Sequence, residues 1–251
     1  MSLGEDVVPN EADRVCDDAE VTAEGEAAQA VPAVEAPIGE SRWPIALALL
    51  AYMAANIALR VWLPHEGAVR VPWLVPAIEA TLLVALLVGD PAKLARRAHW
   101  ARRVAIVLVV VLVIAALWAT GLLVYDLVEG KGVTNSPSEL LASGAVVWLG
   151  NNLSFALLYW LMDSGGPIAR AHNPAPVDFA FTQQMSPELA PPGWRPVFLD
   201  YLHLGFTNAT AFSPTDVMPL SLRAKYTMLV QATVALALFG LIVARAVNAF
   251  T

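Results

Sequence analysis

Charged residues are scarce in this 251-residue chain. Only 15% of its residues are charged and 57% are hydrophobic, whereas about a quarter of the residues in a soluble domain are charged. This shortage argues against an ordinary soluble domain and indicates a membrane protein. The few basic residues form no patch interleaved with aromatic side chains, so we expect no nucleic-acid partner.

Cysteine is almost absent, since Cys16 is the only one. A single thiol cannot form an internal disulfide, so the fold needs no oxidising compartment. The histidines His65, His99, His172 and His203 are scattered, with no second ligand at metal-binding spacing. We therefore expect neither a metal nor another cofactor.

Catalytic motifs are missing too. The chain contains no G-x-S-x-G, no G-x-x-x-x-G-K-[ST] and no H-E-x-x-H, which leaves hydrolase, nucleotide and zinc-protease chemistry without sequence support. A membrane enzyme built on Asp163, Arg170 or Asp216 has no motif behind it. We therefore expect a protein that is not an enzyme.

Acidic residues gather in the segment 1–41, which holds eleven of them against a single basic residue, Arg14. The segment has no aromatic residue and no periodic apolar face, so it cannot bury enough surface to offset the entropy of ordering. We expect a disordered tail. A signal peptide would begin with positive charge and continue into an apolar core, which this segment lacks.

Five apolar runs follow the tail, and about 20 such residues cross a bilayer. They are 43–63, 71–88, 104–128, 139–162 and 224–250. The second is the weakest, because it contains Pro76 and Glu79. The runs predict an all-α polytopic bundle of about five spans. Its parts are the tail 1–41, a four-span region 42–163, a proline-rich loop 164–197 and a C-terminal region 198–251.

Basic residues predict the orientation, because lysine and arginine favour short cytoplasmic loops. With a cytoplasmic N-terminus, eleven basic residues lie inside and four outside, and five of the eleven lie in the 93–103 loop. We therefore expect a multi-pass protein of the bacterial inner membrane with its N-terminus in the cytoplasm. This orientation also puts the loop of residues 163–221 in the cytoplasm.

The stretch "FTNATAFSPTDVMP" at 206–219 interrupts the apolar pattern before the last span. An amphipathic segment that is too short to cross a bilayer starts at Asp200. A hydroxyl-rich turn, Asp216 and Pro219 follow it. We expect a short re-entrant or interfacial helix near 199–212.

This order resembles the pore loop of potassium-type channels over residues 198–248. Thr210 matches the threonine that opens the filter, Ser213, Pro214 and Thr215 match its glycine-tyrosine-glycine, and Asp216 matches its aspartate. The resemblance implies a homo-oligomer, a tetramer if the chain is channel-like, that acts on monovalent cations.

The missing glycines change the expected chemistry of this loop. Stacked carbonyl rings need a backbone that glycine adopts without steric cost, whereas Pro214 holds φ near −65°. What remains is a set of side-chain oxygens that would line a wide, weakly selective vestibule or simply cap a re-entrant helix. They belong to Thr207, Asn208, Thr210, Ser213, Thr215 and Asp216.

The whole chain resembles an uncharacterised family of bacterial polytopic membrane proteins, a domain of unknown function with a channel-like C-terminal segment. The matching features are the arginine-rich loop 93–103, "LLYWLMDSGGPIAR" at 157–170, "VDFAF" at 177–181, and 198–248. The resemblance implies an architecture but no activity.

Several polar or small residues fall inside the predicted spans. Glu79 is either paired or part of a proton or cation relay, and Asn151 and Asn152 are either hydrogen-bonding glue between helices or ligands. Gln231 and Thr233 either pack between helices or line a pathway. Gly240 is either a hinge or a site of close packing.

Two functions follow from these observations. The first is a channel-like membrane protein with a degenerate pore loop and weakly selective ion permeation. The alternative is a non-conducting scaffold or regulatory subunit that keeps a pore-domain-like fold. The charge pattern favours the alternative, because potassium-channel pore loops enter from outside while this loop is predicted to be cytoplasmic.

Overall fold

The structure is a computed structural model that describes residues 43–62, 74–88, 98–129, 137–172, 176–211 and 216–250. All of these belong to one unit, Gly39–Thr251. The predicted tail 1–41 lies outside the described residues, as do Ser213, Pro214 and Thr215 of the filter-like turn.

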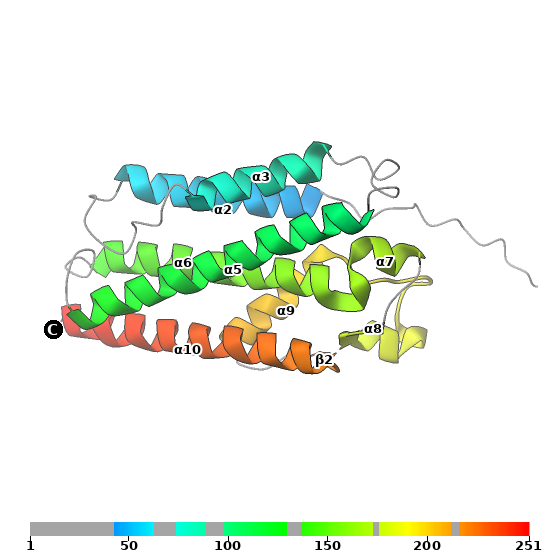
Figure 1. The fold of residues 1–251 in the computed structure, drawn as a ribbon. Coiled ribbons are helices and arrows are strands. Elements are labelled where there is room, and N and C mark those ends of the chain that lie inside the picture. The colour runs from blue at the N-terminus through cyan, green and yellow to red at the C-terminus, as the bar shows by residue number, and fades with distance from the viewer. Residues whose placement is uncertain are drawn as a thin grey trace, which may run out of the picture. The chain divides into compact units, whose positions relative to one another are not determined.

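Long helices form at the five predicted apolar runs (Figure 1). They are α2 (Trp43–Trp62), α3 (Leu74–Val88), α5 (Ala98–Glu129), α6 (Pro137–Met162) and α10 (Leu222–Phe250). Among the described residues, three stretches are long and apolar enough to cross a membrane: Arg103–Asp126, Ser138–Gly165 and Leu222–Ala244. The predicted helical class is therefore confirmed, with three helices of membrane length.

The first two helices, α2 and α3, have shorter apolar stretches than the other three. The apolar part of α2 is Trp43–Ala58. Helix α3 has 15 residues, about 22 Å at 1.5 Å per residue, against about 30 Å for a bilayer core. Pro76 lies in the first turn of α3, where a missing N–H leaves no helical bond unmade.

Helix α6 runs in the opposite direction to the long helices that pack against it. Ile45 and Leu49, near the start of α2, share a cluster with Leu157 and Leu161, near the end of α6, and with Phe198. Late residues of α5 and α10 cluster with the start of α6, through Leu123, Leu238 and Leu140. Helix α6 therefore runs against α2, α5 and α10.

Short elements gather where α6 finishes and α10 begins, and we call this the strand end. They are the 3₁₀ turn η2 (Asp163–Gly165), α7 (Pro167–His172), β1 (Phe179–Phe181), α8 (Thr182–Met185), the 3₁₀ turn η3 (Pro187–Leu189), α9 (Phe198–Thr210) and β2 (Val217–Pro219). Strands β1 and β2 pair antiparallel, with Phe179 opposite Pro219 and Phe181 opposite Val217. The all-helical prediction omitted this small strand pair.

A turn with left-handed backbone ends α6. Gly165 and Gly166 have φ of 81° and 92°, and Ser164 has φ of 50°. Glycine takes such angles without the steric cost that a Cβ brings. The turn ends α6 and leads the chain into the strand end.

Candidate functional site

Helix α9 is the short helix of the pore-like region, and one of its faces is buried. The buried residues recur at helical spacing and are Phe198, Tyr201, Leu204, Gly205, Asn208 and Ala209. Asp200 stabilises the start of the helix, because its Oδ2 accepts the backbone N–H of Val197 at 2.7 Å. The amphipathic pattern therefore determines which face of α9 packs against the long helices.

Helix α9 extends from the strand end to the middle of α6. The ring of Phe198 lies 6.3 Å from that of Trp160, and the ring of Phe206 lies 5.4 Å from that of Trp148. The two tryptophans are twelve residues apart on α6, which is about 18 Å. Figure 1 shows α9 crossing between α6 and α10.

The chain returns to the strand end by Asp216. The Nε2 atom of His203, in the second turn of α9, lies 3.7 Å from Asp216 Oδ2. The next residue, Val217, pairs with Phe181 of β1. The described chain thus leaves the strand end along α9 and is at the strand end again at Asp216, and we call α9 together with residues 216–219 the hairpin.

A buried polar network joins α6, α9 and α10. The Tyr159 hydroxyl donates to Gln231 Oε1 at 2.7 Å, and Asn208 Nδ2 donates to the same oxygen at 2.8 Å. Asn208 Nδ2 also lies 3.0 Å from the Met228 carbonyl oxygen. The three side chains are at most 2% exposed, so these hydrogen bonds satisfy groups that water cannot reach.

Gly205 lets α9 approach this network closely. Gln231 Nε2 donates to the Gly205 carbonyl at 3.0 Å. A Cβ at Gly205 would lie 2.7 Å from Asn152 Oδ1, closer than real Cβ contacts allow. The absence of a side chain at this position therefore brings α9 against α6 and α10 together.

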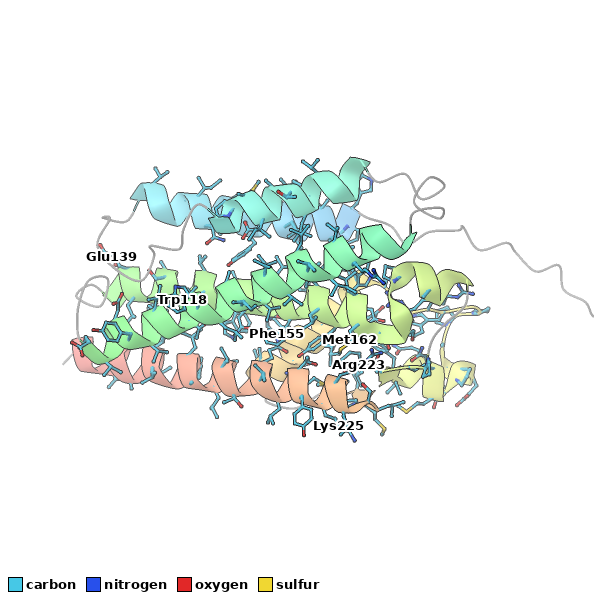
Figure 2. The ribbon with its side chains drawn as sticks, viewed as in Figure 1. Trp118, Glu139, Phe155, Met162, Arg223 and Lys225 are labelled. Atoms are coloured by element: carbon cyan, nitrogen blue, oxygen red, sulfur yellow. The ribbon has the colours of Figure 1, made fainter. Side chains whose placement is uncertain are left out.

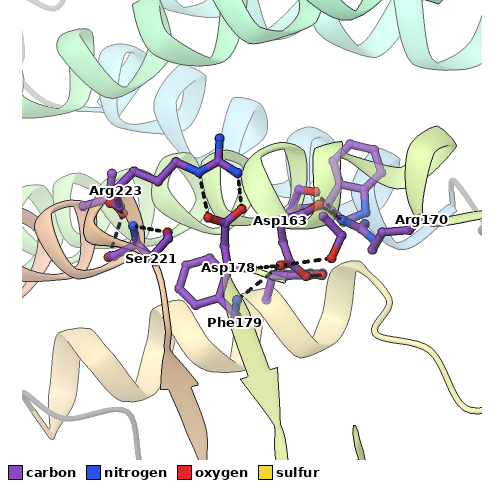
Figure 3. A network of polar contacts seen from close by, with 11 residues as sticks. Asp163, Arg170, Asp178, Phe179, Ser221 and Arg223 are labelled. Carbon is purple, nitrogen blue, oxygen red and sulfur yellow. Dashed lines mark hydrogen bonds and ion pairs between the residues drawn. The ribbon is translucent and has the colours of Figure 1, made fainter. Parts of the chain in front are cut away.

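A second polar network lies at the strand end, around Asp163 (Figure 3). Its Oδ1 accepts the backbone N–H groups of Asp178 and Phe179 at 2.8 and 3.2 Å, and its Oδ2 accepts the Tyr201 hydroxyl at 2.6 Å. Asp163 is fully buried. Its carboxylate therefore joins the end of α6 to β1 and to α9.

Asp178 and Arg223 join β1 to α10. Arg223 Nε donates to Asp178 Oδ1 at 2.6 Å, and Nη2 donates to Oδ2 in a bidentate pair. The Asp178 side chain is 2% exposed and that of Arg223 is 57% exposed. Ser221 caps α10, because its hydroxyl accepts the Ala224 N–H at 3.1 Å.

Arg170 stabilises the C-terminal end of α6. Its Nη1 donates to the carbonyl oxygens of Trp160 and Asp163 at 2.8 and 2.9 Å. Its guanidinium lies 5.1 Å from the centre of the Tyr201 ring. These contacts match the preference of helix C-termini for cations and of aromatic faces for guanidinium groups.

A small polar cavity of about 140 Å³ lies beside the hairpin, lined by Phe181, Gln183, Asp200, His203, Asp216 and Val217. Burial raises the pKa of the Asp200 carboxyl and the Asp216 charge adds to that rise, while the Val197 N–H and His203 oppose it. Within the described ranges, no three His, Cys, Asp or Glu side chains lie close enough together to hold a metal.

The filter-like residues that the structure describes lie in the hairpin. The hydroxyls of Thr207 and Thr210 donate to carbonyl oxygens of α9 itself, at 3.0 and 2.8 Å. Thr210 is exposed, whereas Asn208 is buried and bonded to Gln231. Asp216 lines the polar cavity, away from that buried network.

The predicted residues of the spans have different surroundings. Glu79 is 1% exposed and accepts a 3.4 Å hydrogen bond from Asn56 of α2. Asn151 and Asn152 are buried in α6. Thr233 and Gly240 are exposed on α10. Of the inner-helix residues, the structure therefore brings only Gln231 into the network with Asn208.

Sequence reasoning missed several residues of the two networks. Tyr159 and Tyr201 were absent from the predicted site, as was the pair of Asp178 and Arg223. Asp178 stands in "VDFAF", whose alternating aromatic residues are typical of a strand. That alternation is the sequence signal from which β1 could be predicted. Nothing in the local pattern identifies Arg223 as the partner of Asp178.

Comparison of the chain with protein-family models, with curated proteins and with solved structures finds no match. The function is therefore inferred from the chemistry of the hairpin and its two polar networks.

Proposed function

We propose that the chain is an integral membrane protein with five spans, α2, α3, α5, α6 and α10, and that the hairpin is re-entrant. The three helices of membrane length, α5, α6 and α10, support the membrane assignment, and so does the antiparallel packing of α6 against its neighbours. The shorter α2 and α3 are proposed as spans from their apolar runs in the sequence. Large apolar side chains exposed on α5 and α10 fit a lipid environment. They include Val107, Ile114, Trp118, Leu229, Leu236 and Phe239.

The re-entrant hairpin is supported by where its two limbs lie. Helix α9 starts at the strand end, reaches the middle of α6, and the chain is back at the strand end by Asp216. Backbone that is not helical is tolerated at membrane depth only where protein or water surrounds it. Packing between α6 and α10 supplies protein on both sides of α9.

The strand end is proposed to face the cytoplasm. The described basic residues Arg170, Arg195, Arg223 and Lys225 lie in or beside the short elements there, and Arg103 lies near the start of α5. Such an excess of arginine and lysine favours the cytoplasmic side. The N-terminus would then be cytoplasmic, in the cell membrane of a bacterium.

We further propose that the protein is a non-conducting membrane scaffold with a pore-domain-like fold. One observation carries this proposal: Asn208 and Gln231, two residues predicted to line a pathway, are buried and hydrogen-bonded to each other. Both polar atoms of the Gln231 amide and the Asn208 nitrogen thereby hold α9 between α6 and α10 and are not presented to ions.

Reconstitution into liposomes tests the scaffold. We expect sodium and potassium flux indistinguishable from protein-free liposomes, with the protein shown by protease protection to be inserted. Cation currents that fall when Asp216 is changed to Asn would contradict the scaffold and support permeation through the hairpin.

Weakly selective cation permeation through an oligomer is the second candidate. It is favoured by the exposure of Thr210, Thr233 and Gly240 in a single copy, since residues around a shared axis would be exposed before assembly. In a Cys16→Ser background, Thr210→Cys leaves one thiol per copy, so it should form disulfide-linked dimers if the hairpins of neighbouring copies surround one axis. Monomers alone would exclude this arrangement.

A further inference from the structure

An apolar groove of about 170 Å³ lies between three helices at the strand end. Its walls are Ile106 of α5, Leu158, Leu161 and Met162 of α6, and Arg223 of α10. Figure 2 shows Met162 and Arg223 close to each other, where α6 finishes and α10 begins. The groove therefore combines an apolar interior with one guanidinium group.

The guanidinium of Arg223 is held in place from one side. Asp178 engages its Nε and Nη2, and Asp178 is itself held, because its N–H donates to Asp163 and its carbonyl oxygen accepts the Leu220 N–H at 2.8 Å. The nearby carboxylates of Asp178 and Asp163 are both buried. With the side chain 57% exposed, the remaining N–H groups of Arg223 stay open to an anion.

A second cation lies on the α5 side of the groove. Arg103 is exposed and stands three residues before Ile106 in α5. Residues three apart share a helix face, so Arg103 lies one turn beyond Ile106 towards the start of α5. Arg223 therefore lines the groove itself, and Arg103 stands one helical turn from its Ile106 wall.

We propose that this groove binds an anionic phospholipid, with the phosphate on Arg223 and Arg103 and the first part of one acyl chain against Ile106, Leu158 and Leu161. The inference rests on the proposed membrane placement, with the strand end at a membrane surface. Basic pockets between spanning helices recognise anionic headgroups. A volume of about 170 Å³ is below the roughly 300 Å³ at which whole-ligand pockets begin, which fits part of one chain.

Lipid adducts counted by native mass spectrometry test the site. The full chain is purified in a neutral detergent and offered phosphatidylglycerol or phosphatidylcholine of equal chain length. We expect one phosphatidylglycerol to be retained in preference to phosphatidylcholine. Glycerol phosphate, which has the anion and no chain, should compete poorly. Equal retention of the two lipids, or full competition by glycerol phosphate, would overturn the proposal.

Two variants separate the groove from general charge attraction. Asp178→Asn with Arg223→Gln removes the guanidinium without leaving a buried carboxylate unpaired and without changing net charge. It should bind phosphatidylglycerol about fivefold more weakly. Ile106→Trp keeps both arginines and fills the groove, so it should lose the same preference.

Lys225→Ala is the matched control, because Lys225 is exposed on α10 two residues from Arg223 and therefore on another face. It should leave the preference for phosphatidylglycerol unchanged. The proposed site would be overturned if the preference for phosphatidylglycerol survived in Asp178→Asn with Arg223→Gln. It would also be overturned if Lys225→Ala removed that preference to the same extent. Recovery of the chain without membranes or detergent would instead contradict the membrane placement, so the two failures are distinguishable.

Discussion

Gln231 is the residue on which the buried network depends. Its side-chain oxygen accepts two hydrogen bonds, from Tyr159 and Asn208, and its nitrogen donates to the Gly205 carbonyl. It is fully buried. A single amide side chain of α10 thus satisfies groups on two other helices, α6 and α9. The position is therefore sensitive to replacement by an apolar side chain of similar size.

Replacing Gln231 with Leu should destabilise the protein by about 1–3 kcal/mol, because buried donors and an acceptor lose their partner. The measurement is the free energy of unfolding in a mild detergent. Thr233→Val is the control, since Thr233 is exposed and its hydroxyl donates to the Leu229 carbonyl of its own helix at 2.8 Å. Equal effects of the two changes would contradict the network's role.

Gly205 and Gly240 make a second matched pair. Gly205→Ala should cost about 1–3 kcal/mol, because the new Cβ would meet Asn152 Oδ1 at 2.7 Å and the Asn152 carbonyl oxygen at 3.4 Å. Gly240→Ala should be neutral or slightly stabilising, because nothing lies within 4 Å of that Cβ and alanine favours helix. Thermal unfolding of both variants in the same detergent checks the contrast.

At the scale of elements, the pair of Asp178 and Arg223 decides whether the strand pair stays on α10. Arg223→Ala should destabilise the fold by about 3–5 kcal/mol, because it leaves the buried Asp178 carboxylate without its cation. Asp178→Asn combined with Arg223→Gln should cost clearly less. Limited proteolysis between β1 and α9 would detect release of the strands. Equal losses in the two variants would show that the pair acts in some other way.

The positions of the long helices were predictable because they depend on local composition. Apolar runs such as 104–128 and 139–162 are visible without knowing any neighbour, and α5 and α6 form there. The short α9 was also predictable, because its apolar residues recur at helical spacing from Asp200 onward.

The partners inside the two networks were not predictable from local pattern. Tyr159 and Gln231 are 72 residues apart, and Asp178 and Arg223 are 45 apart. A lone tyrosine or arginine in a sequence is compatible with many partners. Only the packing of α6, β1 and α10 selects among them, so the sequence indicated Asn208 and Gln231 without indicating that they meet.

At the scale of the whole molecule, the alternation of helix direction makes a topological prediction. In a Cys16→Ser background, Asn135→Cys and Ala175→Cys stand before and after α6 in the sequence. If α6 spans the membrane, a membrane-impermeant thiol reagent added to intact cells should label position 135. Position 175 should react only after the cells are opened.

Labelling of both positions from outside would contradict a spanning α6. Labelling of position 175 alone from outside would reverse the orientation inferred from the basic residues at the strand end, and would leave α6 as a spanning helix. The two results therefore test the span and its direction separately.

The order of synthesis places α10 after the elements that it holds. Arg223 and Gln231, which bond to Asp178 next to β1 and to residues of α9, both belong to α10, so they are synthesised after their partners. Until α10 is inserted, Asp178 lacks its cation and the amide of Asn208 lacks its acceptor. Assembly of the region must therefore wait for α10. A nascent chain stalled before α10 would expose unpaired polar groups that membrane quality-control proteases can recognise.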